Sequence, residues 1–188
     1  MRRLLPVLLL AVIPALQGCF PVVATGVGAG ALMAGDRRTS GTYIEDQGIE
    51  LKASNRIEEK FKYAVHANVT SFNRHVLLTG EVPSEAVKQE VGQVVMGVPN
   101  VIDVTNEMAI GNVAPFSARS NDTYITSKVK ARMIDANRFA PHHVKVITES
   151  GVVYLMGMVT RKEAEDAAEI ARTTTDVRKV VKIFEYLD

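Results

Sequence analysis

Hydrophobic and polar residues alternate along the chain in a pattern that occurs twice. Strand-like runs at residues 76–82 and 153–159 share the form Val-x-Leu-x-Gly-x-Val, at an offset of about 77 residues. Each follows another alternating run, at residues 68–72 and 145–149, across a short turn-prone pair of residues. The repeated pattern therefore predicts two β-hairpins, one in each half of the chain.

Helical patterns precede both predicted hairpins. In the second copy, Ile125, Val129 and Met133 recur at i, i+4 and i+8, which places them on one face of a helix at residues 122–136. In the first copy, residues 49–63 show a weaker version of the same pattern. We therefore expect each copy to begin with a helix that packs one apolar side against a sheet.

Each copy continues with a second helix and a last strand. These predicted elements are helices at residues 84–96 and 162–173 and strands at residues 101–109 and 180–186. The order α-β-β-α-β predicts an α+β fold with two tandem modules, each with two helices on one face of a small three-stranded mixed sheet. Aligning Val101 with Val180 widens the offset to 79 and predicts a two-residue insertion in the second copy.

An apolar run precedes the repeats and ends at the only cysteine in the chain. The basic start Met1-Arg2-Arg3 followed by the apolar segment 4–16 is typical of an export signal peptide, and the apolar segment is too short for a membrane-spanning helix. Leu16-Gln17-Gly18-Cys19 resembles the lipobox of bacterial lipoproteins, which implies cleavage before Cys19 and acylation, including palmitate, of that residue. The alternative is an ordinary signal peptide followed by a buried cysteine.

A glycine-rich stretch separates the cysteine from the repeats. Gly26, Gly28 and Gly30 give a Gly-x-Gly-x-Gly spacing, but no strand–turn–helix unit surrounds them, so a nucleotide-binding loop is not expected. We interpret the stretch as a flexible tether. The predicted organisation is a signal peptide at 1–18, a lipidated cysteine and tether at 19–43, a first module at 44–110, a linker at 111–118 and a second module at 119–188.

The charge balance and the titratable residues do not favour nucleic-acid binding or catalysis. Without residues 1–18, two of the 22 Lys and Arg residues are lost, which leaves 20 against 21 Asp and Glu. This near-neutral balance does not favour nucleic-acid binding by bulk charge. His142 and His143 are adjacent and would point to opposite faces of a strand, which is poor geometry for a shared metal. We expect no enzyme activity, metal or cofactor.

The repeated strand, the helix after it and the Gly-Val-x-x-Val entry at Gly97 resemble the BON domain. The resemblance covers two copies from about residue 45 to the C-terminus. With the lipobox and tether, the whole chain is similar to the dual-BON-domain outer-membrane lipoproteins. The second copy departs from the pattern at Asp176, which aligns with Gly97 of the first copy. Asp tolerates a left-handed backbone better than most residues.

The two copies differ in net charge. Residues 44–110 carry 6 basic and 10 acidic side chains, whereas residues 117–188 carry 12 basic and 10 acidic ones. In the second copy a helical wheel places Tyr124 away from the core, and a tyrosine beside lysines suits an anionic membrane surface. Packing of Tyr124 against the other module or the linker is equally compatible with the residues. The predicted phospholipid-binding residues are Tyr124, Thr126, Lys128, Lys130, Ala131 and Arg132.

Two functional hypotheses follow. In dual-BON lipoproteins the second copy binds lipid, so the resemblance implies a non-enzymatic, periplasm-facing outer-membrane lipoprotein that binds anionic phospholipid and supports envelope integrity or remodelling. The alternative is a membrane-tethered adaptor whose sheets bind proteins of outer-membrane assembly or peptidoglycan remodelling.

Overall fold

The computed structural model of the 188-residue chain describes residues 36–113 and 115–188. The predicted signal peptide, the anchor residue Cys19 and most of the predicted tether lie outside the described residues. None of the helices described is both long and apolar enough to cross a membrane.

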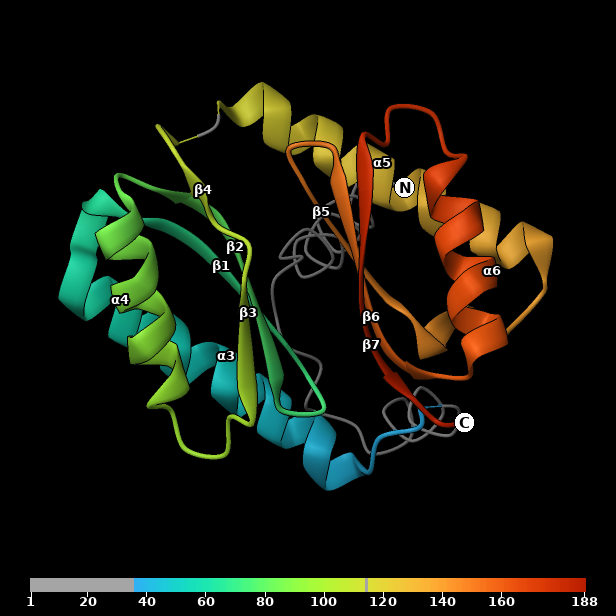
Figure 1. Cartoon of the computed structure of the whole chain (residues 1–188), viewed down its shortest axis with the longest axis horizontal. Coiled ribbons are helices and arrows are strands. Elements are labelled where there is room, and N and C mark those ends of the chain that lie inside the picture. Colours follow the sequence, from blue (N-terminus) through green and yellow to red (C-terminus); the bar gives the residue numbers. More distant parts are fainter. Residues whose placement is uncertain (1–35, 114) are drawn as a thin grey trace, which may run out of the picture. The chain divides into compact units, whose positions relative to one another are not determined.

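The first module combines two helices with a small mixed sheet, the helices lying on one face of it (Figure 1). Strand β2 is central: β1 pairs with it antiparallel, and β3 and β4 pair with it in parallel. The elements are α3 (Ser40–Phe61), a 3-10 turn η2 (Lys62–Ala64), β1 (His66–Phe72), β2 (His75–Val82), α4 (Glu85–Met96), β3 (Asp103–Asn106) and β4 (Ala109–Ile110).

The second module has the same order with one strand fewer (Figure 1). Strand β6 lies between β5, which is antiparallel to it, and β7, which is parallel. The elements are α5 (Phe116–Ala136), η3 (Pro141–His143), β5 (Lys145–Glu149), β6 (Val152–Val159), α6 (Arg161–Arg172) and β7 (Lys179–Tyr186). The α+β class predicted from the sequence is therefore confirmed.

Polar caps explain where several helices begin. Side chains of Thr39 and Ser84 accept backbone N–H groups at the first turns of α3 and α4. At α6 a full capping box forms, because the Thr160 side chain accepts from the backbone of Glu163 while the Glu163 side chain accepts from the backbone of Thr160. The α3 cap lies at Thr39, so α3 begins nine residues before the predicted Ile49.

Each module has its own hydrophobic core between its sheet and its helices. The first core includes Ile49, Val76 and Leu78, and the second includes Ile125 and Leu155. Because side chains alternate along a strand, residues between these core positions point to the other face of the sheet.

Those alternate residues form a third cluster that both modules share. Phe72 and Leu77 of the first module pack with Tyr154 and Met156 of the second, and all four are buried. Polar contacts between the modules surround this cluster, including those from Lys145 to Glu50 and from Asn73 to Glu185. The prediction of two separately cored modules missed this shared cluster.

The structure corrects the predicted three-stranded sheet of the first module. Its last strand is interrupted at residues 107 and 108, so that β3 and β4 both pair with β2 and the sheet has four strands. Met108 is buried in the core at the interruption, with an exposed fraction of 1%. The strand keeps its register across the interruption, because Leu78 pairs with Asn106 and Glu81 pairs with Ala109. Met108 therefore points to the core side, as Val104 does, in agreement with the alternation predicted over residues 101–109.

The predicted two-residue insertion in the second copy is wrong. Helices α4 and α6 begin at residues 85 and 161, and left-handed residues follow them at Asn100 (φ 71°) and Asp176 (φ 72°). Both pairs are 76 residues apart, so the second copy is one residue shorter between hairpin and helix. Asp176 therefore corresponds to Asn100 rather than to Gly97, and both adopt the positive φ that Asn and Asp tolerate.

Glycine is required at one position in each hairpin. A Cβ added at Gly80 would lie 2.1 Å from the carbonyl oxygen of His66, and one at Gly157 would lie 2.2 Å from that of His143. Both glycines therefore permit close approach of the neighbouring backbone.

Candidate functional site

Helix α5 presents the candidate site on its outer face. Its inner face is fixed by Ile125, Val129 and Met133, whose exposed fractions are 1% or less. In the second turn of the helix, the buried carboxylate of Asp122 accepts the backbone N–H groups of Ser150 and Gly151, each at 2.8 Å. Packing and this carboxylate together set the rotation of α5 about its axis.

Two large apolar side chains project from the outer face. Tyr124 is 61% exposed and Ile134 is 62% exposed, and ten residues of helix separate them by about 15 Å. Ala131 is also exposed between them. Tyr124 and Ala131 were predicted for this face, whereas Ile134 was missed, although extending the helical wheel by one turn beyond Ala131 would have included it.

Two of the predicted cations are engaged within the module. Lys128 Nζ lies 2.6 Å from Asp176 Oδ2, 3.0 Å from the carbonyl oxygen of Thr175 and 4.6 Å from the centre of the Tyr124 ring. Arg132 donates to the carbonyl oxygen of Ile170 at 3.0 Å and to hydroxyls of the loop after α6. These contacts tie α5 to the end of α6, so neither cation is freely available.

The remaining predicted residues divide between the two sides of the helix. Thr126 lies on the inner side, where its hydroxyl donates to that of Thr148 at 2.7 Å. Lys130 is exposed and has no hydrogen-bond or ion-pair partner among the residues that the structure describes. Of the cations predicted for lipid binding, Lys130 is thus the one that forms no hydrogen bond or ion pair with the described residues of the module.

A groove of about 520 Å³ lies beside Lys130 at the end of α5. Its other lining residues are mostly apolar or neutral: Met133, Ile134, Asn137, Pro141, His142 and Val144. The combination of an exposed ammonium, an exposed isoleucine and a mainly apolar groove suits an amphipathic ligand.

Within residues 36–113 and 115–188 there is no group of three or more His, Cys, Asp or Glu side chains arranged to hold a metal ion. The rings of His142 and His143 pack edge to face with their centres 4.6 Å apart. His143 Nδ1 lies 3.4 Å from Glu163, a contact that belongs to the cap of α6 rather than to a catalytic pair.

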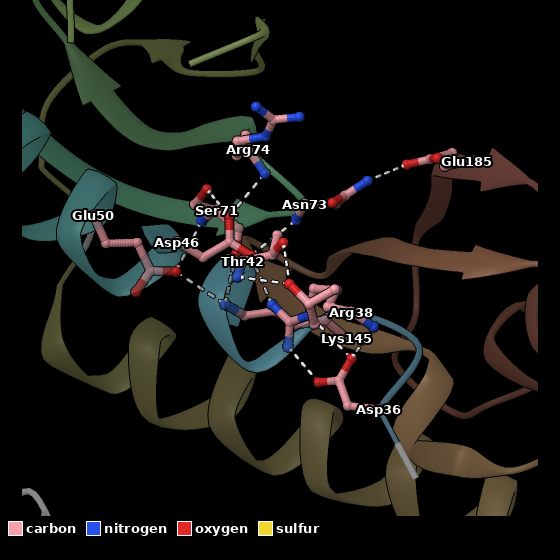
Figure 2. A network of polar contacts seen from close by, with 11 residues as sticks. Asp36, Arg38, Thr42, Asp46, Glu50, Ser71, Asn73, Arg74, Lys145 and Glu185 are labelled. Carbon is pink, nitrogen blue, oxygen red and sulfur yellow. Dashed lines mark hydrogen bonds and ion pairs between the residues drawn. The ribbon is translucent and has the colours of Figure 1, made fainter. Parts of the chain in front are cut away.

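A polar network surrounds Asp46 at the hairpin of the first module (Figure 2). Its buried carboxylate accepts the Ser71 hydroxyl at 2.6 Å and the backbone N–H groups of Asn73 and Arg74 at 2.9 and 2.8 Å. Arg38 completes the set at 2.9 Å. Because these donors fix the carboxylate as a structural tie, the network is not a candidate for catalysis.

The segment before α3 is held by both modules. Arg38 pairs with Asp46 of the first module, while Arg37 forms two hydrogen bonds of 2.7 and 2.9 Å with Glu163 of the second. The hydrogen bonds from Arg37 lower the pKa of Glu163 to about 2, despite the opposing effect of burial. We call Asp36, Arg37 and Arg38 the strap.

Burial affects the pKa of two further groups. It would by itself raise the pKa of Asp36, but hydrogen bonds from the side chain and backbone of Arg38 bring that pKa below its ordinary value. Burial in the shared cluster raises the pKa of Tyr154 to about 12, with smaller contributions from nearby carboxylates. Both groups therefore keep one charge state over the neutral range, as expected of structural groups.

Comparison with known proteins identifies the repeated unit. The BON domain matches residues 46–112 and 121–188. The chain is 40% identical to the outer membrane lipoprotein DolP of Haemophilus influenzae over 92% of this chain and 91% of that protein. It is 30% identical to a 21 kDa hemolysin of Actinobacillus pleuropneumoniae, over 81% of this chain and 79% of that one. It is 29% identical to the osmotically inducible protein Y of Escherichia coli, over 84% and 80%.

Proposed function

The chain belongs to the BON-domain family, with two tandem copies, and from this we propose that it is a non-enzymatic lipoprotein of the outer membrane. In this proposal Cys19 carries the lipid anchor and the protein faces the periplasm. The second BON domain binds anionic phospholipid and thereby supports envelope integrity or remodelling.

The outer face of α5 carries the proposal. Tyr124 and Ile134 stand about 15 Å apart along one exposed side of the helix. Next to Ile134 lies Lys130, which has no ion-pair partner in the described part of the chain. A helix that lies in the membrane interface inserts such apolar side chains while its cations meet lipid phosphates. An aromatic ring with a polar tip is suited to the headgroup layer.

In this proposal, insertion of apolar side chains and electrostatic attraction contribute comparable free energies to membrane binding. Burying each large apolar side chain is worth about 1.5 to 3 kcal/mol if it becomes fully buried. Each basic residue near an anionic leaflet adds about 1 kcal/mol, and this part is screened by salt. We therefore expect binding to weaken with ionic strength without vanishing.

Co-sedimentation of the mature, unlipidated chain with phosphatidylglycerol vesicles tests the proposal. Tyr124→Glu and Ile134→Glu should each reduce binding at least about tenfold, because a carboxylate is repelled by the phosphates and cannot insert. The first module supplies matched controls: Tyr63 is 101% exposed and Leu51 is 64% exposed. Tyr63→Glu and Leu51→Glu should bind as the unmodified chain does.

Circular dichroism of each variant establishes that it is folded. Equal binding by the unmodified chain and a folded Tyr124→Glu, Ile134→Glu double variant would remove α5 from lipid recognition. Equal binding to phosphatidylcholine vesicles would remove the preference for anionic lipid.

The anchor is tested separately. Cys19→Ala should shift the protein from the membrane fraction to the soluble fraction, or leave it unprocessed, and should abolish the mass added by acylation. A Cys19→Ala protein with the membrane fractionation and mass increment of the original would contradict lipidation at this residue.

A further inference from the structure

The last strand differs between the two modules in a way that affects its open edge. Strand β7 runs unbroken for eight residues, Lys179–Tyr186, and is the last strand of its sheet. Its counterpart in the first module is divided into β3 with four residues and β4 with two. Very short edge strands protect a sheet against additional strands, and β7 is not short.

The edge of β7 is basic and its lysines are unsatisfied. Lys179 and Lys182 are exposed, and neither has a hydrogen-bond or ion-pair partner among the described residues. The side chain of the neighbouring Arg178 donates, among the described residues, only to the carbonyl oxygen of Ser150, at 3.3 Å. Glu185, the acidic residue of the strand, already accepts a hydrogen bond from Asn73. A strand that pairs here would therefore meet excess positive charge.

A cleft of about 310 Å³ lies along the same strand. Its apolar lining comes from Phe72, Met156, Ile183 and Phe184, and its polar lining includes the ion pair between His75 and Asp103. The cleft is large enough for one aliphatic or aromatic side chain. It would receive a side chain from a strand that lies beside Ile183.

We propose that the open edge of β7 binds an extended acidic peptide segment of another protein by strand addition. The backbone of the peptide pairs with β7, as in other complexes where a peptide extends a sheet. Carboxylates three residues apart meet Lys179 and Lys182, and one apolar side chain enters the cleft. This site lies on a different element from α5 and does not depend on lipid binding.

Charge disfavours a second copy of β7 as the occupant. An antiparallel pairing that sets Lys179 opposite Glu185 also sets Lys182 opposite Lys182 of the other copy. Like charges directly opposite each other destabilise a strand pair. An acidic partner avoids this repulsion.

The test uses the mature unlipidated chain and the blocked octapeptide acetyl-Thr-Val-Asp-Leu-Thr-Asp-Val-Thr-amide. Its two aspartates are three residues apart, like Lys179 and Lys182. In ¹⁵N-correlated NMR spectra we expect shifts confined to β7 and the cleft, and no shifts with a peptide in which both aspartates are lysine. Two analogues, N-methylated at alternate residues, separate backbone pairing from simple charge attraction, because only one of them blocks the bonded side.

Strand addition predicts that one N-methylated analogue binds at least about tenfold more weakly than the other. On the protein, Lys182→Glu should weaken peptide binding about tenfold. The matched variant Lys130→Glu should leave peptide binding unchanged while reducing vesicle binding, so a failure of this proposal is distinguishable from a failure of the lipid proposal.

Three results would overturn the proposal: no shifts at millimolar peptide, equal binding of the two N-methylated analogues, or no effect of Lys182→Glu. Self-association in light scattering that Lys182→Glu abolishes would also overturn it, in favour of a second copy.

Discussion

The two modules have similar interiors but different surfaces. In both, an aspartate near the start of the first helix accepts hydrogen bonds from the following hairpin: Asp46 in one and Asp122 in the other. In both, a glycine in the central strand permits close backbone approach. The differences lie in the outer face of the first helix and in the edge of the last strand.

Exposed apolar side chains alone do not distinguish the two modules. Helix α3 exposes Ile44 and Leu51 by 67% and 64%, much as α5 exposes Tyr124 and Ile134. The charge around them differs, with 10 acidic side chains in each module but 6 basic ones in the first and 12 in the second. The comparison indicates that added basic residues, rather than added apolar surface, separate the second module from the first.

The largest effects are expected from the two cores. Leu78 and Leu155 are fully buried at equivalent positions of β2 and β6, and Leu→Ala at either should cost about 2 to 5 kcal/mol by leaving a cavity. Because the modules share the cluster around Tyr154, each substitution should also lower the stability of the other module. Denaturant unfolding followed at probes in each module measures this coupling. Two unfolding transitions that shift independently would show that the shared cluster does not couple the modules.

Substitution of the two aspartates that hold the hairpins should give the next largest losses of stability, and the loss should differ between the modules. Asp46 accepts from four donors and Asp122 from two. We expect Asp46→Asn to cost about 3 kcal/mol and Asp122→Asn about 1.5 kcal/mol, since hydrogen bonds to charged groups are the stronger ones. Chemical denaturation of both variants measures the difference. Equal costs would show that the additional donors of the first module add no stability.

The interior was accessible from the sequence because it follows simple periodicities. Alternation identified the paired strands, and the spacing of Ile125, Val129 and Met133 identified the inner face of α5. The shared cluster was not predicted, since alternation reveals that a strand has two faces but not what covers the second one. The ion pair of Lys128 with Asp176 and the contact of Arg132 with Thr174 could not be predicted, because these partners lie more than 40 residues away in the sequence.

A smaller effect depends on pH and concerns the second module. The folded pKa of Glu163 is about 2, below its ordinary 4.5, so its stabilisation is fully present above pH 4.5 and is lost as pH falls toward 2. Solvent screening limits this contribution to about 1 to 2 kcal/mol. Val87 occupies the equivalent position in α4 and cannot titrate.

Unfolding measured between pH 5 and 2 for the unmodified chain and Glu163→Gln tests this expectation. The unmodified chain should lose the additional stability over that interval, and the variant should lack it at every pH. Parallel pH profiles for the two proteins would show that the ion pair with Arg37 does not stabilise the fold.

The smallest effect distinguishes two lysines of α5. Lys128 is held by Asp176, whereas Lys130 has no partner among the described residues. Lys130→Ala should therefore weaken binding to phosphatidylglycerol vesicles by about 1 kcal/mol, roughly fivefold, and Lys128→Ala should weaken it less. A larger loss for Lys128→Ala in co-sedimentation would indicate that its ion pair opens at the membrane.

The strap also has a mechanical consequence. Tension that enters the folded part of the chain at Asp36 first meets Arg37, held by Glu163, and then Arg38, held by Asp46 and positioned over the Phe72 ring. The load is thus divided between the two modules before it reaches the first turn of α3. A pull on the N-terminal side would draw on both modules together and would not peel α3 away from its sheet.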